Sequence, residues 1–274
     1  MQQQVAFIGA GNMARAIIGG LVESGAPASH LRVADALPEV AAALARDFGV
    51  ALAQGNIAAV TGADIVVLAV KPQQMRAVAG EIRDAVASAS PLVLSIAAGI
   101  TTVALRGWLG EHTAVIRSMP NTPALIRRGT TVLFASPAVT PAQRAAAAAI
   151  LGAVGAVHWV DDESLLDAVT ALSGSGPAYV FRLLECLESA GSALGLPGEL
   201  ARALALETVA GAATLACDSG EPAAVLRARV TSKGGTTERA LAALDEGGLQ
   251  ALFERALAAA ADRSRGLAAE FGAA

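Results

Sequence analysis

The feature that most constrains the fold is an apolar strand pattern that runs directly into a glycine-rich turn near the start of the chain. Residues 5–8 are Val-Ala-Phe-Ile, and residues 9–14 follow the pattern Gly-x-Gly-x-x-Ala. Gly9 permits a tight turn, Gly11 lets a pyrophosphate approach the backbone, and Ala14 is small enough for a helix to pack closely on the strand. A predicted amphipathic helix follows at residues 12–24, which is the context that a dinucleotide-binding βαβ unit requires.

A second predicted strand covers residues 31–34 and ends at Asp35. An acidic residue at this position accepts hydrogen bonds from the adenosine ribose of a bound dinucleotide. We therefore predict that the first part of the chain binds a dinucleotide, with Gly9, Gly11 and Asp35 among the cofactor-binding residues.

Strand and helix patterns alternate as far as residue 160. Further apolar strands are predicted at residues 51–53, 64–70, 91–95, 114–118, 131–135 and 156–160. Near-continuous apolar strands separated by helices predict an α/β fold with a doubly wound parallel sheet that is covered on both faces. From Asp161 onward the pattern is helical. We therefore predict a Rossmann-type dinucleotide-binding domain at 1–160 and an all-α substrate and dimerisation domain at 161–274.

Charge and hydropathy argue against several kinds of partner. The chain of 274 residues has a net charge of −4, which does not favour nucleic acid or an anionic membrane surface. The longest apolar run, residues 145–157, is interrupted by glycine and is too short to span a bilayer. No basic segment precedes the first strand, so we expect no signal peptide and a cytoplasmic location.

Cysteine and histidine are sparse and scattered. Cys186 and Cys217 fall on helical patterns, and we expect them to be core residues and not a disulfide or a metal site. His30, His112 and His158 do not cluster in the sequence, and none is expected to be catalytic. We expect no metal ion in the protein.

The helical half contains many alanine- and leucine-rich segments, and these form more apolar faces than the segment can bury alone. We expect a second copy to cover these faces in a symmetric homodimer. The alternative is a self-contained helical bundle.

Residues 230–237, Val-Thr-Ser-Lys-Gly-Gly-Thr-Thr, form a motif that we call the Gly-Gly loop. Two adjacent glycines let successive backbone N–H groups point into one concavity. A helical pattern follows the loop, so the unpaired N–H groups and the positive dipole end of a helix face the same point. Such an arrangement suits a carboxylate or a phosphate. The alternative is a plain Gly-Gly turn with a threonine as helix cap.

Taken together, these motifs resemble the pyrroline-5-carboxylate reductase family over essentially the whole chain. The matching motifs lie at residues 7–13, 68–72, 95–100, 117–123 and 167–179 and in the Gly-Gly loop. The first is shared by many dehydrogenases, whereas the last two are close to family-specific. The resemblance implies an oxidoreductase that uses NAD(P)H to reduce the cyclic imine 1-pyrroline-5-carboxylate to L-proline, the last step of proline biosynthesis.

The resemblance also implies contacts position by position. Cofactor contacts fall on the pyrophosphate residues Ala10, Asn12 and Met13, the adenosine-ribose residues Ala36 and Asn56, and the nicotinamide-ribose residues Val70, Lys71 and Ala98. Ala69 and Pro72 are also expected to bind the cofactor. Substrate contacts fall on Ser232, Gly234, Gly235, Thr236 and Thr237, with Glu163 and Arg229 near the substrate. The family mostly uses NADPH, which is the expected cofactor. NADH is the alternative, because Asp35-Ala36-Leu37 offers an acid and no immediate partner for a 2′-phosphate.

The chemistry of an imine requires little of the protein. Reduction of a carbonyl makes an alkoxide, which needs a proton donor, whereas hydride addition to a protonated imine neutralises its charge. The Thr237 hydroxyl could hydrogen-bond the ring nitrogen while the loop holds the carboxylate, so Thr237 is the predicted catalytic residue. Whether Thr237 or water delivers the proton is open. Lys71 and Lys233 are the two lysines of the chain, but the family tolerates proline at position 233. Tyr179 fits a pocket wall and a helix-packing position equally well.

Two other classes of protein fit parts of the sequence. A carbonyl-reducing enzyme such as a 3-hydroxyacid dehydrogenase would need a lysine or similar acid on a long helix between the domains, and the predicted helix at 177–194 contains no lysine. A non-catalytic dinucleotide sensor would be expected to have lost the Gly-Gly loop. The implied assembly is a homodimer or a larger ring of dimers.

Overall fold

A computed structural model describes residues 3–272 of the chain. It divides into two compact units, one made of the residues up to Ser175 together with those from Ala259, and the other of Gly176–Ala258. The first unit is an α/β unit and the second is helical. The two compact units separate after Ser175. The domain boundary that the sequence predicts after residue 160 stays a prediction.

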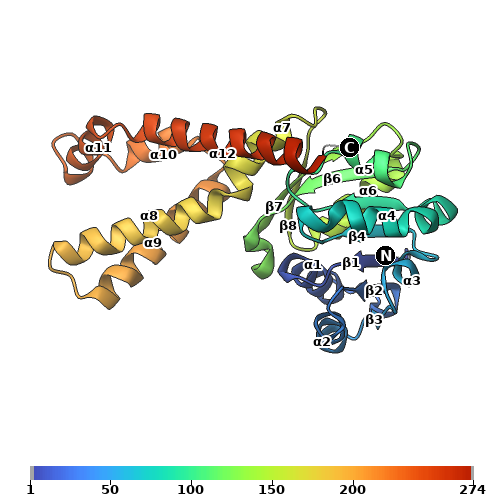
Figure 1. Cartoon of the computed structure of the whole chain (residues 1–274). Helices are drawn as coiled ribbons and strands as arrows, with labels where there is room; N and C mark the ends of the chain where they lie inside the picture. Colours follow the sequence, from blue (N-terminus) through green and yellow to red (C-terminus); the bar gives the residue numbers. More distant parts are fainter. Residues whose placement is uncertain (1–2, 273–274) are drawn as a thin grey trace. The chain divides into compact units, whose positions relative to one another are not determined.

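The first unit is built on one eight-stranded sheet, and all eight predicted strands are present (Figure 1). The strands are β1 (Val5–Ile8), β2 (Leu31–Ala34), β3 (Ala51–Leu52), β4 (Ile65–Leu68), β5 (Leu92–Ser95), β6 (Val115–Met119), β7 (Gly129–Ala135) and β8 (Gly155–Trp159). Their order is β3-β2-β1-β4-β5-β6-β7-β8. The chain therefore leaves β1 in one direction and returns to its other side at β4, which makes the β1–β4 edge the topological switch point.

Two strands correct the prediction of a parallel sheet, because β7 runs antiparallel to β6, with Met119 opposite Val132, and β8 runs in the same direction as β7. Strands β6 and β7 are joined by the short 3-10 helix η2 (Thr122–Ile126). A parallel neighbour needs a crossover of a dozen or more residues, and this connection is too short to provide one. After α6 (Pro141–Gly152), β8 pairs parallel to β7.

Both faces of the sheet are buried, as the continuous apolar strands predict. In β1, Val5 and Phe7 belong to one core, whereas Ala6 and Ile8 belong to the other. The first core is covered by α1 (Asn12–Glu23), α2 (Pro38–Phe48) and α6, and the second by α3 (Asn56–Val60), α4 (Pro72–Ala89) and α5 (Thr102–Leu109). This arrangement confirms the doubly wound α/β fold.

Two segments from the second half of the sequence complete this unit. After β8 come α7 (Leu165–Val169) and a π-helical turn, η3 (Thr170–Gly174). The last part of α12 (Leu249–Gly272) belongs to the same unit, where Phe271 packs against the second core. A short 3-10 helix, η1 (Ala28–His30), precedes β2.

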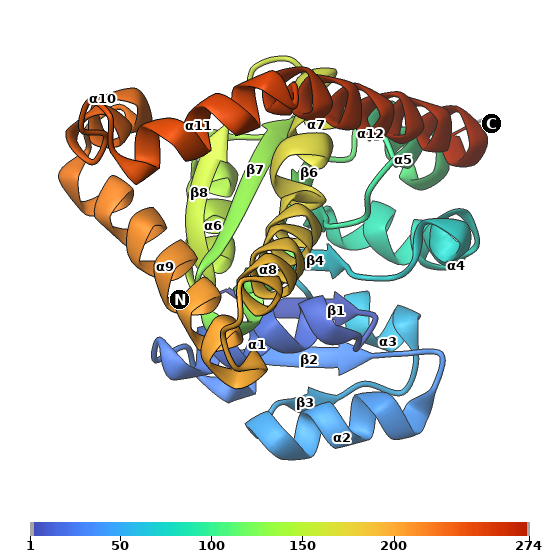
Figure 2. The same cartoon turned by 90° about the vertical axis from the view of Figure 1, so that its left-hand side faces the viewer.

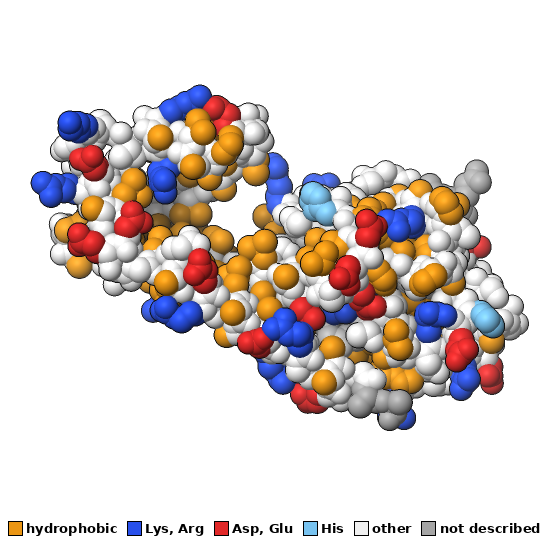
Figure 3. Space-filling model, turned by 90° about the horizontal axis from the view of Figure 1, so that it is seen from above, with side chains coloured by type: hydrophobic (Ala, Val, Ile, Leu, Met, Phe, Trp, Pro, Cys, Tyr) orange, Lys and Arg blue, Asp and Glu red, His pale blue; other side chains and the backbone are white. Residues whose placement is uncertain are grey.

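The helical unit contains α8 (Gly176–Ala193), α9 (Gly198–Ser219), α10 (Ala223–Arg229), α11 (Thr236–Glu246) and the first part of α12. The two long helices α8 and α9 contact each other and diverge from the turn that joins them (Figure 2). Many large apolar side chains of this unit are exposed in the single chain (Figure 3), among them Phe181, Leu183, Leu204, Leu215 and Phe253. An all-helical second half is therefore confirmed, but its apolar faces are not buried within one chain.

The two cysteines correct another expectation. Cys186 on α8 and Cys217 on α9 are both free thiols, and both are exposed and not part of a core. The reason is that α8 buries no residue within the single chain, and α9 buries two alanines, Ala201 and Ala205. A helical pattern identifies the face of a helix, but it does not show whether the same chain covers that face.

Candidate active site

The turn after β1 requires glycine at position 9. Gly9 has a φ of +101°, in the region that favours glycine, and a Cβ there would stand 2.5 Å from the carbonyl oxygen of Ala69. The Gly9 N–H donates to the carbonyl oxygen of Ala34 at 2.8 Å. The turn is therefore fixed between the ends of β2 and β4, and a side chain would displace backbone.

Gly11 is different, because nothing in the chain itself requires glycine there. It is the N-cap of α1, with φ −69° and ψ −179°, an ordinary extended conformation. A Cβ at Gly11 would meet no heavy atom within 4 Å. The open space lies before the first N–H groups of a helix, where a phosphate binds well. This open position fits the pyrophosphate of a dinucleotide.

A cleft of about 610 Å³ lies where β1, β2 and β4 end, at the switch point of the sheet. The structure brings eight of the predicted cofactor residues together as its lining: Gly9, Gly11, Asp35, Ala36, Asn56, Ala69, Val70 and Lys71. Three others, Ala10, Asn12 and Pro72, are adjacent in sequence to these residues, and Met13 follows Asn12. Ala98 follows β5 outside the lining. The cofactor contacts themselves stay predictions.

The carboxylate of Asp35 is held by backbone on both sides. Its Oδ2 accepts a hydrogen bond from the Ala10 N–H at 2.7 Å, and its Oδ1 accepts one from the Leu37 N–H at 2.9 Å. Asp35 thereby ties the glycine turn to the start of α2. The sequence indicates the acid at the end of β2, but not this bracing role.

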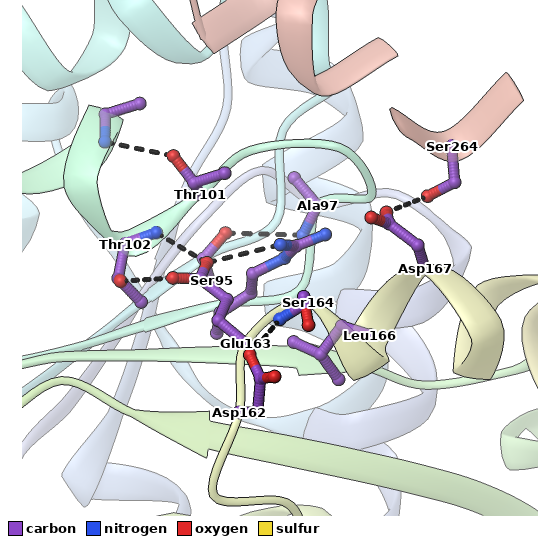
Figure 4. Close-up of polar contacts among 12 residues, drawn as sticks. Ser95, Ala97, Thr101, Thr102, Asp162, Glu163, Ser164, Leu166, Asp167 and Ser264 are labelled. Atoms are coloured by element: carbon purple, nitrogen blue, oxygen red, sulfur yellow. Dashed lines mark hydrogen bonds and ion pairs between the residues drawn. The ribbon is translucent and has the colours of Figure 1, made fainter. Parts of the chain in front are cut away.

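Glu163 is engaged within the first unit, at the N-terminus of α5 (Figure 4). One oxygen, Oε1, accepts from the Thr102 N–H at 2.8 Å and from Arg117 Nη1 at 3.2 Å, and Oε2 accepts from the Thr102 hydroxyl at 2.6 Å. The Arg117 side chain is 5% exposed and that of Glu163 is 17% exposed. The predicted substrate contact of Glu163 is untested, and the structure shows a carboxylate that caps a helix and neutralises a buried arginine.

The neighbouring acid, Asp162, makes a local turn. Its Oδ1 accepts a hydrogen bond from the Ser164 N–H at 2.9 Å. This backbone hydrogen bond, with one from the Ser164 side chain, lowers the pKa of the exposed Asp162 carboxyl below its ordinary value. The turn leads the chain from β8 into α7.

Other residues form hydrogen bonds that connect α7 and η3 to the neighbouring elements. The Asn121 amide donates to the carbonyl oxygen of Ser173 at 3.0 Å, and its oxygen accepts from the Thr130 N–H at 2.9 Å. The hydroxyl of Ser264 on α12 donates to Asp167 at 2.7 Å (Figure 4). Asn121, Asp167 and Ser173 fall in the motifs at 117–123 and 167–179, whereas Thr130 and Ser264 lie outside them, and none of these residues is a predicted site residue.

The Gly-Gly loop lies in the helical unit, between α10 and α11. Gly234 has a φ of +73°, in the region that favours glycine, whereas Gly235 is extended and a Cβ there would stand 2.5 Å from the Ser232 hydroxyl oxygen, which would have to move. Helix α11 begins at Thr236 with Gly235 as its N-cap and no side-chain cap. The alternative of a threonine-capped turn is therefore wrong, and the first N–H groups of α11 have no cap from a side chain.

A carboxylate already binds this loop within the chain. The Gly234 N–H donates to Oε2 of Glu238, in the first turn of α11, at 2.7 Å. Thr237 is half-buried, and Ser232 and Thr236 are exposed. Arg229, the last residue of α10, pairs with Glu221. The loop thus has the geometry and the polarity to accept a carboxylate.

The glycine turn, the cleft at the switch point and the doubly wound sheet define the class of protein, a dinucleotide-binding oxidoreductase. The family described as NADP oxidoreductase, coenzyme F420-dependent, matches residues 4–99, and the family described as pyrroline-5-carboxylate reductase dimerisation matches residues 163–267. A pyrroline-5-carboxylate reductase from Pseudomonas aeruginosa is 48% identical over 269 residues, which cover 98% of each chain. The chain belongs to the pyrroline-5-carboxylate reductase family.

Solved structures agree with this assignment. A pyrroline-5-carboxylate reductase from Coxiella burnetii superimposes with a TM-score of 0.94 at 41% identity, covering 97% of this chain and 99% of that one. A Plasmodium falciparum pyrroline carboxylate reductase with NADP bound gives a TM-score of 0.86 at 26% identity, covering 97% and 98%. The predicted family and fold are both confirmed.

Proposed function

We propose that this protein reduces 1-pyrroline-5-carboxylate to L-proline with NADPH or NADH. The observation that carries the proposal is the carboxylate held on the Gly234 N–H, at a loop whose sequence characterises the family. The substrate of this reaction carries one carboxylate beside a cyclic imine, so a small anion site without a metal suits it. Among residues 3–272, no cluster of His, Cys, Asp or Glu has metal-binding geometry.

The residues around the cleft fit a dinucleotide, because the open position at Gly11 admits a pyrophosphate and Asp35 presents a carboxylate to a ribose. We expect Ala10, Asn12 and Met13 to bind the pyrophosphate, with Val70, Lys71 and Ala98 on the nicotinamide side. When bound, the cofactor supplies the hydride. The protein supplies binding and orientation, which are the larger part of what such a reaction needs.

Different groups of the Gly-Gly loop bind different parts of the substrate. Backbone N–H groups and the Ser232 hydroxyl bind the carboxylate, while the Thr237 hydroxyl accepts a hydrogen bond from the N–H of the protonated ring nitrogen. An iminium loses its positive charge as the reduced amine forms, so no side chain has to protonate an alkoxide. Thr237 matters most as that charge changes, and Ser232 matters mainly for binding.

Replacing Thr237 with alanine should therefore lower kcat. A lost hydrogen bond to a charged group is worth roughly 1.5–3 kcal/mol, which corresponds to about tenfold to a hundredfold in rate. Ser232→Ala should instead raise KM for the imine and leave NADPH affinity unchanged. Steady-state kinetics on the two variants measure this division. Wild-type kinetics in both would show that residues 230–237 form a structural turn only.

We further propose that the helical unit pairs with a second copy, as a homodimer or a ring of dimers. The exposed apolar side chains of α8 and α9 and the match to a dimerisation family support this proposal. Helix α9 is also long and apolar enough to cross a membrane, the one such helix in the described part of the chain. Helix α9 also carries Arg202 and Glu207, and charged residues are costly inside a membrane. We therefore propose that its apolar surface packs against a partner copy in a cytoplasmic protein.

Light scattering at micromolar concentration should return a dimer or a multiple of it. We expect no folded monomer, since a single chain leaves these helices with their apolar faces in water. A stable and active monomer is the result that would overturn the proposal.

A further inference from the structure

The loop between β5 and α5, residues 96–101, borders the cofactor cleft, and we call it the β5–α5 loop. The Ile96 N–H donates to the carbonyl oxygen of Leu68, the last residue of β4, at 3.2 Å. Ala69, which follows Leu68, lines the cleft. Ala98, in the middle of the loop, is the expected contact with the nicotinamide ribose. The position of this loop therefore determines where one half of the cofactor is bound.

Hydrogen bonds fix both ends of the β5–α5 loop. At the first end, the carbonyl oxygen of Ser95 accepts from the Ser118 hydroxyl at 2.8 Å, and the Ser95 hydroxyl accepts from the Ala97 N–H at 3.4 Å. At the other end, Glu163 accepts from the N–H and the hydroxyl of Thr102 (Figure 4). The ends of the loop are therefore tied to the sheet and to the connection between β8 and α7.

The middle of the loop is held by packing. Among residues 3–272, none is hydrogen-bonded to Ala98 or Gly99. Gly99 is buried and has a φ of +74°, and a Cβ there would stand 3.0 Å from the Cβ of Leu267 on α12. Helix α12 therefore lies directly against the backbone of Gly99, one residue after the expected cofactor contact.

Helix α12 is anchored on both sides of this contact. Ser264, Leu267 and Phe271 are spaced by three and four residues, so they share one face of the helix. Ser264 is 2% exposed, and its hydroxyl donates to Asp167 on α7 at 2.7 Å (Figure 4). Phe271 packs against the second core, which also contains the residues that flank the middle of the loop. These two anchors hold the last turns of α12 against Gly99.

We propose that the last turns of α12 position the nicotinamide half of the cofactor by holding the β5–α5 loop in place. Ser264 and Phe271 are positioning residues, because neither lines the cleft and both act through the loop. The inference rests on the proposed function, in which Ala98 contacts the nicotinamide ribose. The adenosine half is expected at other elements, the N-terminus of α1 and the end of β2. Loosening α12 should therefore weaken the binding of one half of the cofactor and not of the other.

Calorimetric titration of the purified protein with NADPH and with adenosine 2′,5′-bisphosphate, the adenosine end of NADPH, tests the proposal without any substrate. Phe271→Ala removes the packing at the second core and releases the end of α12. It should raise the Kd of NADPH by roughly twofold to tenfold, the scale of one hydrogen bond, and leave the Kd of adenosine 2′,5′-bisphosphate unchanged. With the imine as substrate, kcat should fall by about tenfold or more, because a small misplacement of the reacting groups slows a reaction strongly.

Ser264→Ala removes the other anchor, the hydrogen bond to Asp167, and should have the same selective effect on the two Kd values. Phe271→Leu keeps an apolar side chain at the second core and should retain most of the NADPH affinity. Glu270→Ala is the matched control, because it lies on the same helix and removes an exposed ion pair with Arg263. Both of its Kd values should equal those of the unaltered protein.

Equal losses of affinity for both ligands in Phe271→Ala and Ser264→Ala would overturn the proposal, because they would show a general structural role for α12. Unchanged NADPH affinity in both variants would also overturn it. If Phe271→Ala fails to fold, Ser264→Ala decides. A selective loss of NADPH affinity in a protein that does not reduce the imine would overturn the proposed function and support this inference.

Discussion

Gly11→Val should lower the affinity for NADPH by at least about a hundredfold, equivalent to ~2.7 kcal/mol of binding free energy, while the protein stays folded. The structure separates these two effects. Gly11 has extended backbone that valine adopts readily, and a Cβ there meets no heavy atom. The added side chain would instead occupy the space in front of α1, where the pyrophosphate must touch backbone.

The comparison with Gly9→Ala makes the test specific. A Cβ at Gly9 would collide with backbone at Ala69, and the φ of +101° is strained for alanine, so this variant should lose thermal stability. NADPH fluorescence measures binding, and thermal unfolding measures the fold. Unchanged NADPH affinity in Gly11→Val would show that the glycine turn does not bind the cofactor.

Glu163→Ala should destabilise the protein by about 3–5 kcal/mol, because it leaves the buried Arg117 guanidinium without its carboxylate. The same change removes the acceptor for the Thr102 N–H and hydroxyl at the start of α5. Urea unfolding at a fixed protein concentration measures the loss, since an oligomer's stability depends on concentration.

Asp47→Ala is the control for Glu163→Ala. It breaks an ion pair with Arg15 in which both side chains are nearly half exposed, so it should cost at most about 1 kcal/mol. If Glu163→Ala is as mild as Asp47→Ala and changes only KM for the imine, then Glu163 serves the substrate, as the family resemblance implies.

The sequence predicts the sheet well because burial on both faces leaves a strong signal in each strand. It does not predict the direction of β7, since an apolar strand such as Gly129–Ala135 reads the same in either orientation. The information lies in the connection through η2, which is too short for a crossover. Connection length would have indicated the antiparallel pair.

Some features of the candidate site can also be predicted from the sequence, and others cannot. The glycine positions of the site can be predicted from the sequence, because Gly9 and Gly234 adopt positive φ and few other residues can replace them. The partners of a charged residue cannot be predicted in this way, since Glu163 is hydrogen-bonded to Arg117 and Thr102, which lie 46 and 61 positions away in the sequence. The exposed state of Cys186 also escapes sequence analysis, because it depends on what covers α8.

Oxidation of NADPH or NADH in the presence of 1-pyrroline-5-carboxylate, with a 2-oxo acid and a 3-oxo acid as parallel substrates, tests the central claim most directly. The account predicts rapid oxidation with the imine, formation of L-proline, and no turnover of either oxo acid, because reduction of an oxo acid makes an alkoxide that needs a proton donor, whereas hydride addition to a protonated imine does not. Turnover of an oxo acid at a comparable rate, or none of the imine, would contradict imine reduction as the function of this protein.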